Sequence, residues 1–253
     1  MFSPEICNKD VFALCALKEG KPTKKKRWMI PLILISVAVL AFCIYVSDYS
    51  HADEVALKAL VSDESVLIER TGYGWFFDGP STDTVFVFYP GGKVEETAYA
   101  PMLHEIAEKG MDVCLIKMPF RLAVLGSSRA DGVLNQYDYE KRYIGGHSLG
   151  AVVAGIYAAK HDLDGVIMFA GYPDRDVDEP MLMIYGSEDG IISMGKVAAA
   201  DQYGTVKKVI IEGGNHAGFG NYGDQKGDGH AGITAEEQQA AAIQALFSWI
   251  KSF

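Results

Sequence analysis

The chain has 253 residues, 49% of them hydrophobic and 22% charged, which is the balance of a globular protein with one sizeable core. Residues 1–27 carry seven Lys and Arg against three acidic residues, whereas the rest of the chain carries 16 Lys and Arg against 30 acidic residues. The main domain is therefore acidic and would repel phosphate backbones, which excludes nucleic acid as an expected partner despite the basic run at 24–27.

An uncharged apolar stretch, WMIPLILISVAVLAFCIYV, occupies residues 28–46. At about 1.5 Å rise per residue, a helix of this length matches the hydrocarbon core of a bilayer. Basic residues precede the stretch and acidic residues follow it, and the basic flank of a membrane span stays inside. We therefore predict a cytoplasmic basic leader at 1–27, a transmembrane anchor at 28–46, and a single-pass protein of the cell membrane whose main domain is extracytoplasmic.

A cleaved signal peptide is the alternative. Residues 50–52 (SHA) form the small-x-small pattern that signal peptidase accepts, which would place cleavage after Ala52. The apolar stretch is longer than the roughly 7 to 15 residues typical of a signal peptide, and the leader before it is also long. These two features favour an anchor.

Cys114 is the only cysteine beyond the predicted anchor, so the main domain cannot form a disulfide of its own. No Cys-x-x-Cys pattern is present either. We expect a domain that is held together by its core, with neither a metal nor an organic cofactor.

A linker at 47–65 is expected to lead into a main domain at 66–253. The segment 65–70 predicts a first strand, which a turn would join to a second strand in a hairpin. From there on, short and nearly continuous apolar runs alternate along the chain with helical stretches. The predicted strands are 84–89, 112–117, 143–145, 165–170, 181–185 and 208–211. Strands of this kind are buried on both faces, which is typical of a mostly parallel sheet with helices on both faces, in the α/β class.

Helices are predicted at 98–109, 149–160 and 235–251. The last of them opens with Thr234 three residues before Glu237, which is the spacing of a capping box. The segment 213–232 is rich in Gly, Asp and Asn and predicts a loop.

Residues 146–150 read GHSLG, a G-x-S-x-G pattern between a predicted strand and a predicted helix. Glycines at this place permit a tight turn that lifts the Ser148 hydroxyl out of the sheet. The helix that follows directs the positive end of its dipole at a developing oxyanion. We therefore predict that Ser148 is a nucleophile, and the alternative is a glycine-rich turn with an incidental serine.

A serine hydroxyl is a weak nucleophile at neutral pH, so it needs a histidine that takes its proton and a carboxylate that orients the histidine. In this strand-turn-helix context both follow the serine, the acid first. Asp189 and His216 each lie just past a predicted strand, at the edge where open α/β sheets gather their ligands. We predict Asp189 as the acid, ahead of its neighbour Glu188. His216 is the predicted base, ahead of His230, which does not directly follow a strand.

A tetrahedral intermediate also needs hydrogen-bond donors for its oxyanion. The backbone N–H of Leu149, the residue after the nucleophile, is the first predicted donor. The second should come from the loop after strand 84–89, where residues 90–93 read PGGK and two glycines let the backbone approach a ligand. Gly92 is the first choice and Lys93 the second, and a plain strand-to-loop turn is the alternative.

Five segments carry a resemblance to a known family: 89–94 (YPGGKV), 117–120 (KMPF), 145–150 (GGHSLG), 185–190 (YGSEDG) and 213–217 (GGNHA). Together they resemble the compact bacterial α/β hydrolases akin to the dienelactone-hydrolase group, often called alpha/beta hydrolase fold-5 proteins, from about residue 84 to the C-terminus. The resemblance implies an α/β-hydrolase fold and a serine hydrolase with the triad named above, but no firm substrate.

The chain departs from this family in two ways. Ala151 stands where a third glycine often follows the elbow, and its methyl group is expected to crowd the packing of the helix slightly. Dienelactone hydrolases proper use a cysteine nucleophile, so Ser148 argues against that particular activity.

Only about 40 residues separate Ser148 from Asp189, the interval in which this fold commonly carries a lid. A helix, a strand and a short loop at 172–179 fill the interval, so no large cap domain fits. The pocket would then be covered by 120–135 and 219–232, and such an open pocket suits a small or exposed acyl substrate.

We therefore predict a membrane-anchored, esterase-like serine hydrolase that acts through an acyl-enzyme. The alternatives are a catalytically silent domain that serves as a binding module and an acyltransferase at the same site. The sequence indicates no oligomeric state.

Overall fold

The computed structural model describes residues 24–80 and 83–252, so most of the predicted leader lies outside the described residues. The chain divides into two compact units, Met1–Ser47 and Asp48–Phe253. The second unit begins well before residue 66, where the sequence predicted the main domain to start. From Asp48 onward, the predicted linker therefore belongs to this unit. Ala56, within that stretch, is completely buried.

Helix α1 runs from Lys24 to Ser47. Its part Trp28–Ser47 has a mean hydropathy of 2.7, and none of its most apolar window is buried against other protein. The predicted apolar helix is therefore present, with the length and composition of a membrane span. A signal sequence near an N-terminus shares these two properties.

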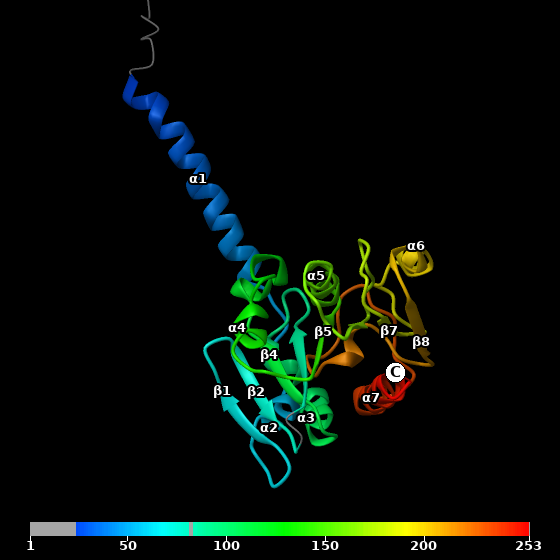
Figure 1. Ribbon diagram of the computed structural model, residues 1–253. Helices are drawn as coiled ribbons and strands as arrows, with labels where there is room; N and C mark the ends of the chain where they lie inside the picture. Colours follow the sequence, from blue (N-terminus) through cyan, green and yellow to red (C-terminus); the bar gives the residue numbers. More distant parts are fainter. Residues whose placement is uncertain (1–23, 81–82, 253) are drawn as a thin grey trace, which may run out of the picture. The chain divides into compact units, whose positions relative to one another are not determined.

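Eight strands form one sheet in the order β1-β2-β4-β3-β5-β6-β7-β8 (Figure 1). The strands are β1 (Leu67–Arg70), β2 (Gly74–Asp78), β3 (Thr84–Tyr89), β4 (Asp112–Ile116), β5 (Lys141–His147), β6 (Gly165–Phe169), β7 (Met181–Gly186) and β8 (Val206–Ile211). β2 pairs antiparallel with β1 and β4, and all other pairs are parallel. This confirms the predicted α/β class, the mostly parallel sheet and the hairpin at its start.

Helices cover both faces of the sheet, as predicted. The helices of the second unit are α2 (Glu54–Lys58), α3 (Ala100–Glu108), α4 (Asp131–Leu134), α5 (Leu149–Ala158), α6 (Met194–Ala199) and α7 (Ala235–Ile250). Figure 1 shows α3 and α7 on one face and α5 and α6 on the other. On β3, Phe86 and Phe88 belong to the core with α3 and α7, whereas Val85 and Val87 belong to the core with α5. All four are fully buried, which explains why the strand reads as an unbroken apolar run.

Several local features can be compared with their predictions. The capping box of α7 is present, because the Thr234 hydroxyl accepts from the Glu237 N–H and the Glu237 carboxylate accepts from the Thr234 N–H. The helix predicted at 98–109 is instead a 3-10 turn, Glu96–Tyr99, followed by α3, whose first turn contains Pro101. Residues 170–180, between β6 and β7, form neither helix nor strand, so no cap domain is inserted there.

Candidate active site

Ser148 lies between the end of β5 and the start of α5, with φ 51° and ψ −120°. A positive φ is unfavourable for a residue with a side chain, and the local packing explains why the backbone turns so sharply. A Cβ on Gly146 would lie 2.3 Å from the Tyr89 carbonyl oxygen, and a Cβ on Gly150 would lie 2.2 Å from the same atom. Both flanking positions therefore need glycine, and the serine side chain sits at the apex of the turn.

The alanine after the elbow is accommodated by a second glycine. Ala151 is completely buried, and a Cβ on Gly171 would lie 2.4 Å from the Ala151 Cβ. The methyl group that was expected to crowd the helix therefore occupies space that Gly171 leaves open.

His216 and Asp189 come together after the ends of β8 and β7. The Nδ1 atom of His216 lies 2.9 Å from Oδ2 and 3.1 Å from Oδ1 of Asp189, and both side chains are essentially inaccessible to solvent. The backbone N–H groups of Ile191 and Ile192 also donate to Oδ1 of Asp189. Three donors therefore hold this carboxylate in one orientation.

The other ring nitrogen of His216, Nε2, is buried and has no hydrogen-bond partner among the described residues. Because Nδ1 donates to a carboxylate, Nε2 carries the lone pair and can accept a proton. The elbow lies beside it, since the ring of His147, the residue before Ser148, is 4.7 Å from the His216 ring. Among the described residues no hydrogen bond joins Nε2 to the Ser148 hydroxyl, so the structure brings the acid and the histidine together and places the serine on the neighbouring elbow without a direct contact to Nε2.

The two alternatives for these positions lie elsewhere. Glu188 is exposed, and its carboxylate accepts from the hydroxyl of Ser187 rather than from a histidine. His230 is also exposed. The histidine that contacts Asp189 is His216.

The backbone N–H of Leu149 is the first of α5, so it has no acceptor within the helix. Gly92 lies against the side chain of the same residue, because a Cβ on Gly92 would be 2.9 Å from Cδ2 of Leu149. The N–H of Lys93 is already used, since it donates to the Arg121 carbonyl oxygen at 2.9 Å. Gly92 therefore stays the candidate for the second oxyanion donor, and the geometry disfavours Lys93.

A buried chain of hydrogen bonds joins the glycine loop to His216. The Tyr99 hydroxyl accepts from the Gly91 N–H at 3.0 Å and donates to Nδ1 of His147 at 2.9 Å. Nε2 of His147 then donates to the His216 carbonyl oxygen at 3.0 Å. This direction gives every donor an acceptor. Burial, and then the neighbouring His216, hold the pKa of His147 well below its ordinary value, so His147 is neutral.

Asp228 links the segment that bears the acid to the segment that bears the base, and no sequence pattern selects it as a site residue. Its Oδ1 atom accepts from the N–H groups of Gly190 and His216, both at 3.1 Å, and its Oδ2 atom accepts from that of Ala217 at 2.8 Å. Asp228 therefore fixes the backbone on which Asp189 and His216 stand. No local pattern in a loop rich in Gly and Asp distinguishes it from Asp224.

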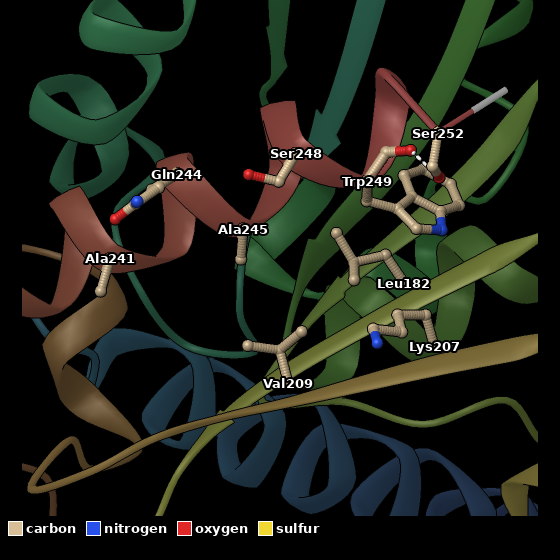
Figure 2. Close-up of a pocket in the computed structure, with 9 residues that line it drawn as sticks. All are labelled: Leu182, Lys207, Val209, Ala241, Gln244, Ala245, Ser248, Trp249 and Ser252. Carbon is tan, nitrogen blue, oxygen red and sulfur yellow. Dashed lines mark hydrogen bonds between the residues drawn. The ribbon is translucent and has the colours of Figure 1, made fainter.

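Two cavities lie near functionally different parts of the domain. The larger, of about 610 Å³, lies between α7 and the strand residues Leu182, Lys207 and Val209 (Figure 2). Leu182 and Lys207 are each second in their strand, so this cavity reaches the end of β7 and β8 that lies away from Asp189 and His216. A smaller one, of about 300 Å³, is lined by residues 48–50, 92–94 and 224–226, beside the glycine loop. Within the described residues, no group of three or more His, Cys, Asp or Glu side chains could hold a metal ion.

Comparison with known proteins agrees with this architecture. A model of the alpha/beta hydrolase family matches residues 85–240, which is more than half of the chain. No curated protein matches the chain in sequence.

Several solved structures share the fold at low sequence identity. A dienelactone hydrolase from Anabaena variabilis is 15% identical with a TM-score of 0.54, over 76% of this chain and 98% of that one. A ferulic acid esterase from Streptomyces cinnamoneus is 15% identical with a TM-score of 0.53, over 66% of each chain. An alpha-beta serine hydrolase homologue from Coxiella burnetii is 13% identical with a TM-score of 0.50, over 74% of this chain and 99% of that one.

Proposed function

The chain belongs to the alpha/beta hydrolase family, and we propose that it is a serine hydrolase of carboxylic esters. The observation that carries the proposal is the state of His216. Its Nδ1 atom donates to Asp189, while its buried Nε2 atom has no partner among the described residues and lies beside the elbow that bears Ser148. A buried nitrogen acceptor without a donor is costly unless a hydroxyl or a substrate completes it.

The proposed reaction has two halves. The Ser148 hydroxyl attacks the ester carbonyl carbon while His216 Nε2 takes its proton, and the resulting oxyanion accepts from the N–H groups of Leu149 and Gly92. His216 then protonates the leaving alcohol, which leaves an acyl-enzyme on Ser148. A water molecule, deprotonated by the same nitrogen, attacks the acyl carbon. The bond from that carbon to the Ser148 oxygen breaks, His216 returns the proton to this oxygen, and the carboxylic acid leaves. Asp189 keeps the imidazole in the required tautomer and stabilises its protonated form.

A small or exposed acyl group is the proposed substrate, because nothing is inserted between β6 and β7 that could enclose a long chain. The names of two proteins of similar fold, a dienelactone hydrolase and a ferulic acid esterase, support ester chemistry as the reaction class. Their identity to this chain is too low to indicate which ester is the substrate.

We also propose that α1 is a membrane anchor with the N-terminus in the cytoplasm. The support is the length and hydropathy of Trp28–Ser47 and the basic run before it. Protease added to intact cells or protoplasts is expected to digest the domain after Ser47. Protection of the domain in sealed cells, with digestion after permeabilisation, would contradict this topology.

The test of the hydrolase proposal is hydrolysis of short p-nitrophenyl esters by the purified full-length chain in detergent. Ser148→Ala should remove activity to the level of the uncatalysed reaction, because no other residue is proposed to form the acyl-enzyme. Ser128→Ala, which makes the same change at an exposed serine, should behave as the wild type. If Ser148→Ala retains wild-type turnover, or if the wild type hydrolyses no ester, the proposal fails.

A further inference from the structure

The segment that joins α1 to the main domain, residues 48–53, pairs with the loop that bears the candidate oxyanion donor. We call it the junction segment. Ser50 forms a parallel β-bridge with Val94. The Ser50 N–H donates to the Lys93 carbonyl oxygen at 2.8 Å, and the Ser50 carbonyl oxygen accepts from the Glu95 N–H at 2.9 Å. Two backbone hydrogen bonds thus hold the chain immediately after Gly92.

Side chains of the same segment reach the same loop. Asp48 Oδ2 lies 2.9 Å from Lys93 Nζ, and the Arg121 guanidinium lies 3.3 Å from the centre of the Tyr49 ring. The Asp48 side chain is 89% exposed, so this ion pair contributes little to stability. The contact of Arg121 with Tyr49 has more effect on the loop, because the Arg121 carbonyl oxygen accepts the N–H of Lys93.

The far end of the junction segment is fixed to the domain as well. The Ala52 N–H donates to the Glu95 carboxylate at 3.1 Å, and the Asp53 N–H donates to the Asn221 carbonyl oxygen at 2.9 Å. Asp53 also caps α2, in which Ala56 is completely buried. The junction segment is therefore an ordered part of the domain on both sides of Ser50.

The hydrogen bonds to the junction segment help to hold Lys93 in an unfavourable backbone conformation. Its φ of 60° is unfavourable for a residue with a side chain and persists only where surrounding contacts impose it. Those contacts are the hydrogen bonds of its N–H to Arg121 and of its carbonyl oxygen to Ser50. The Gly92 N–H belongs to the peptide between Gly91 and Gly92, one peptide before the Lys93 N–H. Loss of the hydrogen bonds at Lys93 would free the backbone that follows Gly92, so that the Gly92 N–H could turn away from the oxyanion.

We propose that the junction segment positions the oxyanion loop, so that the domain is fully active only while residues 48–52 remain attached to it. The inference rests on the proposed ester hydrolysis. Cleavage after Ala52 would produce a chain that begins at Asp53. This chain would lack the hydrogen bonds of Ser50 and the ring of Tyr49. Such processing would weaken the enzyme.

Proline substitution tests the backbone hydrogen bond in the full-length chain, because proline has no N–H to donate. Ser50→Pro removes the donor to Lys93. The matched control is Glu54→Pro, since position 54 is the first of α2, where proline is favourable and no helix hydrogen bond is lost. Ser50→Pro is expected to lower kcat for p-nitrophenyl acetate about tenfold with little change in KM, and Glu54→Pro to leave both unchanged.

Inhibitor binding separates positioning from a general loss of structure. A boronic acid forms a tetrahedral adduct with a serine and so uses the oxyanion donors, whereas the bound ester before attack does not. Its Ki should rise in Ser50→Pro by about the same factor as kcat falls. In a second series, Tyr49→Ala should show the same two changes to a smaller extent, and Tyr49→Phe, which keeps the ring, should restore wild-type values.

Wild-type activity distinguishes the two proposals. A wild type that hydrolyses no ester overturns the proposed function and the inference with it. If the wild type is active and Ser50→Pro and Tyr49→Ala, both folded by thermal melting, match it in kcat and boronate Ki, the junction segment has no positioning role. The same kcat loss in Glu54→Pro as in Ser50→Pro would overturn the inference as well.

Discussion

The two ends of the parallel strands differ in what they hold. At the carboxyl end, Ser148 has a left-handed φ, His216 is buried against Asp189, and Asp228 accepts four hydrogen bonds from the backbone of two loops. At the amino end, α7 and β7–β8 enclose the larger cavity, of about 610 Å³. Aliphatic side chains, Trp249 and a few polar side chains line this cavity (Figure 2).

The larger cavity of this domain is not where the candidate catalytic residues lie. The residues around the larger cavity have ordinary backbone angles, and Lys207 is the only titratable side chain among its lining residues. The carboxyl end instead concentrates an unfavourable backbone angle and buried polar groups, features that persist where the surrounding structure imposes them. Substitutions at the carboxyl end should therefore mainly lower turnover. Substitutions at the amino end should mainly lower the free energy of unfolding.

The largest expected effect separates His216 from His230. His216→Ala removes the proposed base, so kcat should fall about 10⁴-fold or more, while His230→Ala changes an exposed loop residue and should cost about tenfold or less. Both are measured with the same p-nitrophenyl ester at saturating concentration. The reverse pattern would make His230 the base.

Asp228→Asn should have the next largest effect. An amide offers a single acceptor atom and presents N–H groups toward backbone donors, so the loops of Asp189 and His216 would separate slightly. We expect kcat to fall about 10- to 100-fold with little change in KM. Asp224→Asn, the same change at an exposed residue of the same loop, is the control. Equal activities of the two variants would show that Asp228 does not position Asp189 and His216.

His147 predicts how stability depends on pH. Its pKa is depressed in the folded protein, so only the unfolded chain takes up a proton as the pH falls below about 6.5. This histidine is therefore expected to cost about 1.4 kcal/mol of unfolding free energy between pH 7.5 and 5.5. Urea denaturation gives the free energy of unfolding at each pH for the wild type and for His147→Asn, whose side chain does not titrate. Between pH 7.5 and 5.5 the wild type should lose about 1.4 kcal/mol more than the variant. Parallel pH dependences would contradict it.

A substitution at the amino end should leave turnover unchanged. Trp249 is 7% exposed and packs against Tyr143 at 6.2 Å between ring centres. Trp249→Ala should lower the free energy of unfolding by about 3–5 kcal/mol while kcat per folded molecule stays within about twofold of the wild type. The folded fraction is counted by active-site titration. A large loss of kcat in folded protein would place function in this cavity.

The sequence predicted the parallel strands well because strands buried on both faces are continuous apolar runs. Thr84–Tyr89 is the clearest case, since the predicted and observed limits agree. Ser148, Asp189 and His216 could be selected because each directly follows such a strand. The structure brings the last two together, and their catalytic roles stay predictions.

Other features could not be predicted, because they depend on contacts between distant parts of the chain. Tyr99 ends the short 3-10 turn Glu96–Tyr99, which has no recognisable motif, and only the folded structure places its hydroxyl between Gly91 and His147. Asp228 resembles its neighbours in composition. The sequence predicts a linker where the junction segment lies, because the partner with which the segment pairs is more than 40 residues away in sequence.

The most direct test of the central claim is the site of covalent reaction with a fluorophosphonate. Trypsin should release residues 143–160 as one peptide, in which Ser148 is the only serine. Mass spectrometry of the labelled full-length protein should find the phosphonyl adduct on this peptide at Ser148, and denatured protein should not react. An adduct on another peptide, or no adduct on protein that hydrolyses esters, would contradict Ser148 as the nucleophile.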